Sequence, residues 1–156
     1  MNLNEHIYRI KNLMYEQPQI KVVYDGDMSN KMGKSIELLT PNGEQIGKLF
    51  LTKLKWANQL DKEFDLHYDE KLFQTIPINY DNSLFGHTFE VNNKFRGNGY
   101  GNKLLDYCHD FVNKSGHNYL TFIMDFNNPI AENLYNKRNY NVLSSTPKTK
   151  FYFVKV

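Results

Sequence analysis

A glycine-rich loop carries the clearest chemistry in the sequence. Arg96-Gly97-Asn98-Gly99-Tyr100-Gly101 lies between a β-prone run that ends at Val91 and a helical pattern that starts near Asn102. Its glycines let the backbone approach a ligand without interference from a Cβ atom. The first turn of the next helix supplies unpaired N–H groups and the positive end of the helix dipole. The loop therefore predicts a phosphate or diphosphate site, although a flexible turn has a similar composition.

The sequence does not match three other ligand-binding loop motifs. The dinucleotide-binding motif needs Gly-x-Gly-x-x-Gly, whereas these glycines follow Gly-x-Gly-x-Gly. That motif also needs an acidic residue about 20 residues further on, and only Asp125 comes near this position. Gly33-Lys34-Ser35 matches the tail of an ATP-binding loop, but Met28 stands where the upstream glycine is required. Asp25-Gly26-Asp27 lacks the other oxygen ligands of a calcium loop. We interpret residues 25–27 and 33–35 as turns.

The elements around the glycine loop follow an α/β order. A nearly continuous apolar run before Asp125 predicts a buried strand, and Gly116 is expected to end the helix before it. Asn128 and Pro129 have the residue types of an N-cap and of a first helical position. The expected strands are 84–91, 119–124, 140–143 and 151–156, and the expected helices are 102–114 and 129–138.

The first half of the chain is expected to be hairpin-like. Pro41-Asn42-Gly43 separates the β-prone runs 35–39 and 45–54, and both Asn and Gly tolerate the positive φ of a hairpin turn. Residues 3–16 predict an amphipathic helix, whereas residues 57–82 leave helix and strand open. We expect one domain of class α/β (mixed α+β), with a sheet that is antiparallel early and parallel around the glycine loop.

Composition and charge narrow the class of protein. A chain of 156 residues with 40% hydrophobic residues can bury one core. The single cysteine, Cys108, excludes a disulfide scaffold and indicates a reducing compartment. The formal charge is +2, and Arg9, Arg96 and Arg138 are the only arginines, which makes nucleic-acid binding a minor alternative. Neither a membrane span nor an apolar signal-peptide core is apparent, so we expect a cytoplasmic protein without a membrane partner.

Two motifs resemble the GNAT acetyltransferase superfamily, which uses acetyl-CoA. The glycine loop matches Arg/Gln-x-x-Gly-x-Gly/Ala, and residues 128–140 are similar to Asn-x-x-Ala-x-x-Leu/Phe-Tyr-x-Lys-x-Gly-Phe. Asn139 replaces the usual glycine, and asparagine also tolerates left-handed backbone geometry. The resemblance implies a mostly antiparallel mixed sheet, flanked by helices, whose parallel central strands splay around acetyl-CoA. Residues 84–143 would bind acetyl-CoA, 1–83 would form the variable acceptor side, and 144–156 would add a last strand.

The resemblance also implies roles for particular residues. Backbone groups near Phe89 and Val91 would pair with the pantetheine arm, and Asn128 would hydrogen-bond the same arm. Tyr135 stands where many members place the acid that protonates the departing thiolate, although a buried core tyrosine would occupy the same helical position. The N–H groups that would hold the diphosphate follow Arg96 and belong to Gly97, Asn98, Gly99, Tyr100, Gly101 and Asn102.

Acetyl transfer to an amine also needs a base and an oxyanion donor. An ammonium with a pKa of about 10.4 must lose a proton before it can attack. His87 is the first candidate base, and strand alternation places it on the face of Phe89 and Val91. Many family members carry an acidic residue there. Glu90, expected on the opposite face, is the second candidate, and a water chain is the third. A backbone N–H near Val91 would bind the oxyanion.

The expected function is an acetyl-CoA-dependent N-acetyltransferase that transfers the acetyl group directly within a ternary complex. Acetyl-CoA (coenzyme A) would be the cosubstrate, and no metal is expected because the histidines lack ligand spacing. No covalent intermediate is required, so Cys108 is expected to fill the core. The partner would be a small-molecule or peptide amine, and a homodimer is left open. A non-catalytic acyl-CoA-binding sensor or regulatory module is the alternative.

Overall fold

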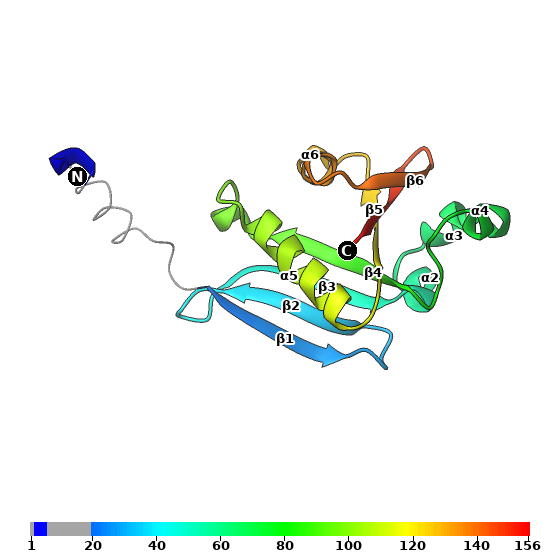
Figure 1. Cartoon of the computed structure of the whole chain (residues 1–156), viewed down its shortest axis with the longest axis horizontal. Coiled ribbons are helices and arrows are strands. Elements are labelled where there is room, and N and C mark those ends of the chain that lie inside the picture. The colour runs from blue at the N-terminus through cyan, green and yellow to red at the C-terminus, as the bar shows by residue number, and fades with distance from the viewer. Residues whose placement is uncertain (1, 6–19) are drawn as a thin grey trace.

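One seven-stranded sheet of mixed direction organises the molecule (Figure 1). The computed structural model describes residues 2–5 and 20–156, so the helix expected over 3–16 lies mostly outside the described residues. The strand order is β1-β2-β3-β4-β5-β7-β6, and β4 and β5 are the parallel pair, which confirms the expected mixed sheet. The strands are β1 (Lys21–Asp27), β2 (Gly33–Leu39), β3 (Gln45–Lys53), β4 (Ser83–Val91), β5 (Tyr119–Asp125), β6 (Asn141–Ser145) and β7 (Thr149–Lys155).

Helices cover the two faces of the sheet unequally. The segment left open by the sequence, 57–82, forms three short helices and no strand. None of the described helices is long and apolar enough to cross a membrane. The helices are η1 (Leu54–Trp56), α2 (Ala57–Leu60), α3 (Phe64–His67), α4 (Glu70–Thr75), η2 (Asn93–Phe95), α5 (Tyr100–Lys114) and α6 (Pro129–Lys137).

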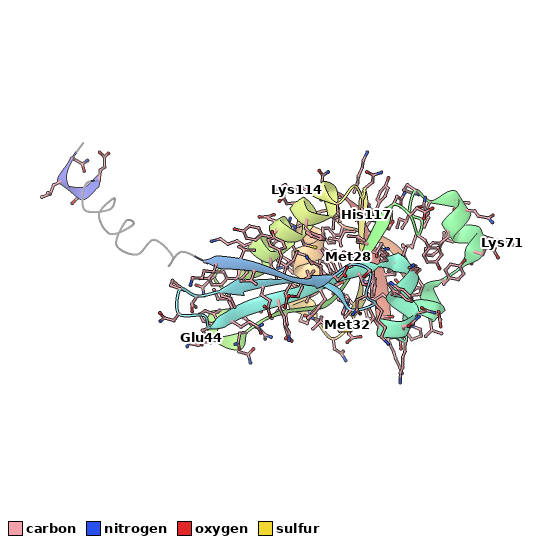
Figure 2. The ribbon with its side chains drawn as sticks, turned by 90° about the horizontal axis from the view of Figure 1, so that it is seen from below. Met28, Met32, Glu44, Lys71, Lys114 and His117 are labelled. Atoms are coloured by element: carbon pink, nitrogen blue, oxygen red, sulfur yellow. The ribbon has the colours of Figure 1, made fainter. Side chains whose placement is uncertain are left out.

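Two apolar clusters separate the two faces. On one face, α5 and α6 pack on the sheet, and the cluster includes Leu84, Phe122 and Cys108, which confirms that this cysteine fills the core. On the other face, the segment from η1 to α4 packs on the sheet around Phe64 and Phe85. Lys71 of α4 and Glu44 of the β2–β3 turn lie far apart in Figure 2, so α4 is remote from that turn.

Local sequence signals set the helix ends as expected. The Asn128 side chain accepts a hydrogen bond from the Ala131 N–H at 3.1 Å, and Pro129 begins α6. Gly116, with φ +82°, follows the end of α5. Asn139 adopts φ +59° after α6, which confirms that asparagine replaces glycine in this left-handed position.

The expected turns at residues 25–27 and 33–35 were wrong. Both segments pair with each other at the ends of β1 and β2, and the turn lies between them at 28–32. Side-chain bonds hold that turn: Asp27 accepts from the Ser29 N–H at 2.9 Å, and Asn30 accepts from the Met32 N–H at 3.1 Å. Glycine and aspartate therefore extend the strand here and do not end it.

The parallel strands separate partway along their length, forming a fork. β4 pairs with β5 only from Ser83 to Gly86, although β4 continues to Val91 and β5 continues to Asp125. Figure 1 shows the two strands running apart beyond this point. The ring of Phe122 lies over Gly86, where a Cβ atom would come within 2.0 Å of it. A side chain at residue 86 would therefore displace the ring that lies at the start of the fork.

Replacing Gly86 with alanine is expected to destabilise the fold. The added methyl group overlaps the Phe122 ring, and overpacking of a core costs about 1–3 kcal/mol. Urea unfolding measures the change. The double variant G86A/F122L is expected to recover part of the loss because leucine frees the space. Equal stability of G86A and the parent protein would show that the ring is not fixed over this glycine.

Candidate functional site

The glycine loop leads directly into an uncapped helix N-terminus at the open end of the fork. Gly99 is the N-cap of α5, with φ +79° and no side-chain hydrogen bond to the helix. The first helical bond runs from the Lys103 N–H to the Gly99 carbonyl at 3.2 Å. The amides of the first turn therefore point out of the helix with its positive dipole end. This geometry fits an anion such as a diphosphate.

The three glycines of the loop have different structural roles. Gly97 and Gly99 both adopt φ +79°, and a Cβ atom at either would meet nothing within 4 Å. Glycine readily adopts this left-handed backbone conformation, and its lack of a side chain leaves the space beside the loop open. Gly101 faces inward, where a Cβ atom would lie 3.3 Å from Leu134 of α6. Gly101 thus allows close packing of α5 against α6.

Polar side chains hold the loop in shape. Arg96 Nε donates to the Val91 carbonyl at 3.0 Å, so the guanidinium folds back onto the end of β4. Asn98 Nδ2 donates to the Phe95 carbonyl at 3.1 Å and to the Arg96 carbonyl at 3.3 Å. Tyr100 is buried against Phe95, which leaves its backbone as the part available to a ligand. These side chains shape the loop, and its backbone amides remain the groups that could bind an anion.

β4 offers a free edge inside the sheet. Beyond Gly86 its side toward β5 has no strand partner, since the β4–β5 pairing ends there. Unpaired N–H and C=O groups on such an edge can pair with an extended ligand as an added strand would. Phe89 and Val91, predicted to lie along the pantetheine arm, are on this free segment.

A β-bulge in β4 changes which face each candidate base occupies. Two residues of β4, Thr88 and Phe89, oppose Leu49 alone, and Thr88 has φ +52°. His87 pairs with Phe50 and Glu90 pairs with Lys48. Phe50 and Lys48 are two residues apart and share a face.

The expected grouping of His87 with Phe89 and Val91 was therefore wrong. His87 and Glu90 lie together on the face opposite α5, because the extra residue of the bulge shifts the alternation of side chains. Phe89 and Val91 lie on the α5 face, near Gly101. The prediction assumed that side chains alternate regularly between the two faces of β4, and the bulge interrupts that alternation.

Tyr135 packs at the fork on the α5 face. Its ring lies 5.3 Å from that of Phe122 on β5 and 6.3 Å from that of Phe89 on β4. It also stacks on Tyr140 at 5.1 Å, with 7° between the planes. Burial raises the pKa of Tyr135 well above its ordinary value, and nearby Tyr140 adds to the shift. The phenol therefore stays protonated near neutral pH and can act only as a proton donor.

His87 occupies an aromatic setting on the other face. Its ring stacks on Phe50 at 5.4 Å and lies 6.4 Å from Phe85. Burial lowers the pKa of His87 below its ordinary 6.5, while the Met32 backbone and Asp61 oppose the shift. The imidazole is thus neutral at pH 7 and can accept a proton.

Glu90 and Asn128 have local partners. Glu90 is exposed and forms an ion pair with Lys48 at 3.3 Å. The Asn128 amide oxygen caps α6, so its amide nitrogen is the part that could donate to a ligand. Asn102 accepts from Arg138 Nη1 through its side-chain oxygen at 3.2 Å. These contacts limit which atoms of the predicted residues can reach a ligand.

Gly86 and Phe122 shape the fork but were absent from the sequence-based candidates. An isolated glycine inside a strand signals a bulge or a close approach, and Gly86 meets that description beside the bulge at Thr88. Phe122 had no distinguishing signal, since it stands in a uniformly apolar run.

The arrangement combines three chemical capacities in one region. Backbone amides that make no helical hydrogen bond lie at the start of α5, a free strand edge runs along β4, and a protonated phenol lies at the fork. Helix N-termini and ligands commonly meet at the carboxyl ends of parallel strands. A long ligand with a charged end and an extended arm fits this combination.

Comparison with known proteins gives the family. The profile described as "Acetyltransferase (GNAT) family" matches residues 52–140, more than half of the chain. The chain belongs to the GNAT acetyltransferase family, whose activity is acyl transfer. No curated protein matches this sequence.

Solved structures share the fold at low sequence identity. A GCN5-related N-acetyltransferase from Kribbella flavida has a TM-score of 0.59 and 12% identity, covering 95% of this chain and 76% of its own. A GNAT-family acetyltransferase from Staphylococcus aureus Mu50 also has a TM-score of 0.59 and 12% identity, with coverages of 81% and 70%. A provisionally named streptothricin acetyltransferase from Bacillus anthracis strain Ames, in complex with acetyl coenzyme A, has a TM-score of 0.58 and 15% identity, with coverages of 87% and 69%.

Proposed function

We propose that this protein is an acetyl-CoA-dependent N-acetyltransferase that transfers the acetyl group directly to an amine in a ternary complex. The observation that carries the proposal is the fork beyond Gly86, with the uncapped start of α5 at its open end and Tyr135 packed against it. The family and the acetyl coenzyme A complex of a structural neighbour support the same donor.

In this proposal the donor follows the elements of the fork. The diphosphate binds the amides from Gly97 to Asn102, beside Arg96 and Asn98, which hold the loop. The pantetheine arm pairs with the free edge of β4 near Phe89 and Val91, with Asn128 as a further donor. The thioester then lies between β4 and β5, where a backbone N–H of β4 stabilises the oxyanion.

The acid and the base act from opposite faces of the sheet. The amine nitrogen attacks the thioester carbonyl and loses a proton to His87, with Glu90 as the second candidate base. The C–S bond then breaks, and Tyr135 gives its proton to the departing sulfur. The two groups suit this division, because burial keeps Tyr135 protonated and His87 neutral.

The acceptor enters from the His87 face in this account. The segment from η1 to α4 packs on that face, and Phe64 of α3 lies 6.2 Å from Phe85, the neighbour of His87. Phe64 itself is buried in this packing, so it supports the acceptor side without lining it. A small-molecule or peptide amine fits the proposal equally.

The test is release of coenzyme A from acetyl-CoA in the presence of a panel of amines and peptides. Thiol detection follows the rate, and mass spectrometry identifies the acetylated product. We expect turnover with at least one amine and a product carrying a new amide. Binding of acetyl-CoA without turnover across the panel would instead indicate the non-catalytic sensor.

The pH profile tests His87 as the base. Because burial lowers its pKa, the imidazole stays neutral to below pH 6.5, so kcat/KM is expected to fall only as the pH drops below 6.5. His87→Gln is expected to lower kcat/KM at pH 7 by about 100-fold and to remove this acid limb. An unchanged limb in the variant would assign it to another group, and Glu90→Gln would then be tested in the same way.

A further inference from the structure

Arg138 joins the two helices that carry the proposed donor site. It is the C-cap residue of α6, three residues after Tyr135, and its side chain is 20% exposed. Its Nη2 donates to Asp106 Oδ1 of α5 at 2.7 Å. Its Nη1 donates to the side-chain oxygen of Asn102 at 3.2 Å and faces the Asn102 carbonyl at 3.5 Å. One guanidinium thus holds the first turn of α5 and the turn that follows it.

These contacts lie at the point where the two helices touch. One turn before Arg138, Leu134 packs at the place where a Cβ atom on Gly101 would lie 3.3 Å away. Gly101 and Asn102 are consecutive residues in the first turn of α5. The contact between Leu134 and Gly101 sets how closely the two helices approach, and the planar guanidinium of Arg138 sets how one helix is positioned along the other.

The same guanidinium is also close to the aromatic stack that holds Tyr135. Burial raises the pKa of Tyr140, and the positive charge of Arg138 opposes that shift. Tyr140 stacks on Tyr135, and its hydroxyl bonds to His109 of α5. Arg138 therefore bonds the first turns of α5 and also lies near Tyr140, whose ring stacks on that of Tyr135.

A role in stability alone does not explain the way this arginine is placed. Its Nε is buried without a hydrogen-bond partner, so its burial is only partly compensated. The residues that Arg138 does bond, Asn102 and Asp106, lie in the first two turns of α5. An arginine held this way fits a geometric requirement better than a requirement for charge alone.

We propose that Arg138 is a positioning residue that fixes the anion-binding turn of α5 relative to Tyr135. This inference rests on the proposed function, since it concerns the distance between the diphosphate and the proton donor. If that distance changes by about 1 Å, the thioester no longer lies against the phenol, and a loss of about 100-fold in rate is typical of such misplacement.

The test compares Arg138→Met with Lys137→Met, which removes a positive charge from the exposed neighbour in the same turn. Calorimetry measures the Kd of acetyl-CoA, and steady-state kinetics give kcat, both at a temperature where each variant is folded by circular dichroism. We expect Arg138→Met to raise Kd about 10-fold and to lower kcat about 10- to 100-fold. Lys137→Met is expected to stay within 2-fold of the parent, by the small effect of exposed charges.

Two further variants separate position from charge. Arg138→Lys keeps the positive charge but loses the planar guanidinium, so it is expected to recover little of the kcat that is lost in Arg138→Met. Asp106→Asn is expected to have a small effect alone and none when added to Arg138→Met, because both act through one contact. Full recovery by lysine, or a lower melting temperature with unchanged Kd and kcat, would overturn the proposal. If the parent protein failed to bind acetyl-CoA, the proposed function itself would fail instead.

Discussion

Replacing Tyr135 with phenylalanine is expected to lower kcat for acetyl transfer about 100-fold, while the Kd of acetyl-CoA stays within about 2-fold. The phenylalanine ring keeps the stacking with Phe122 and Tyr140, so the fork retains its shape. The hydroxyl proton alone is lost, and the thiolate must then leave without protonation. Single-turnover kinetics with a good acceptor separate this chemical step from product release.

Tyr152 offers a matched control for this experiment. Its ring lies 5.1 Å from that of Tyr135, and its hydroxyl is buried without a hydrogen-bond partner. Tyr152→Phe removes the same atom from the same aromatic cluster, so kcat is expected to stay within about 2-fold of the parent value. Equal losses in the two variants would mean that Tyr135 serves the packing of this cluster and not proton transfer.

Replacing Gly99 with valine is expected to weaken acetyl-CoA binding about 10- to 100-fold, since charge-assisted hydrogen bonds contribute about 1.5–3 kcal/mol each. Gly99 has φ +79°, a conformation that a β-branched residue strongly disfavours. Relaxation of the loop would turn the amides of the first turn of α5 away from the diphosphate. Calorimetry with acetyl-CoA measures the change directly.

Gly116 provides the control at the other end of the same helix. It has φ +82°, and a Cβ atom there would also meet nothing within 4 Å. Gly116→Val therefore carries a similar backbone cost, roughly 1–2 kcal/mol, far from the anion site. Its melting temperature is expected to fall about as much as that of Gly99→Val, with the Kd of acetyl-CoA unchanged. A matching loss of affinity would attribute both effects to general destabilisation of α5.

Signals close together in the sequence predicted much of the fold. The hairpin around Gly43, the N-cap at Asn128 and the left-handed Asn139 depend on the backbone preferences of single residues, and all three are observed. The glycine loop was identified for the same reason, since positive φ at Gly97 and Gly99 is a local property. Such features need little tertiary information.

The faces of β4 could not be predicted this way. Strand alternation is reliable only while the pairing is regular, and the bulge at Thr88 and Phe89 adds one residue on one side of the pair. His87 consequently moved to the face opposite Phe89. Nothing in residues 84–91 marks the bulge except Gly86, whose neighbour across the fork is Phe122.

Contacts between segments that are distant in the sequence also could not be predicted from the sequence. Arg138 meets Asn102 and Asp106 only because α6 packs on α5 through Leu134 and Gly101. The segment 57–82 mixes polar and apolar residues because its short helices and the loop after α4 bury single side chains, such as Phe64 and Ile78, against the sheet. Neither pattern has the periodicity that indicates a long helix or strand.

The central claim is that amides at the start of α5 hold the diphosphate of acetyl-CoA while its arm lies along the free edge of β4. Titration of acetyl-CoA into the ¹⁵N-labelled protein, followed by amide shifts and hydrogen exchange, tests it most directly. We predict saturable shifts from Gly97 to Asn102 and slower exchange of amides from His87 to Val91. Saturation that left both sets of amides unchanged, or an absence of binding at millimolar acetyl-CoA, would contradict it.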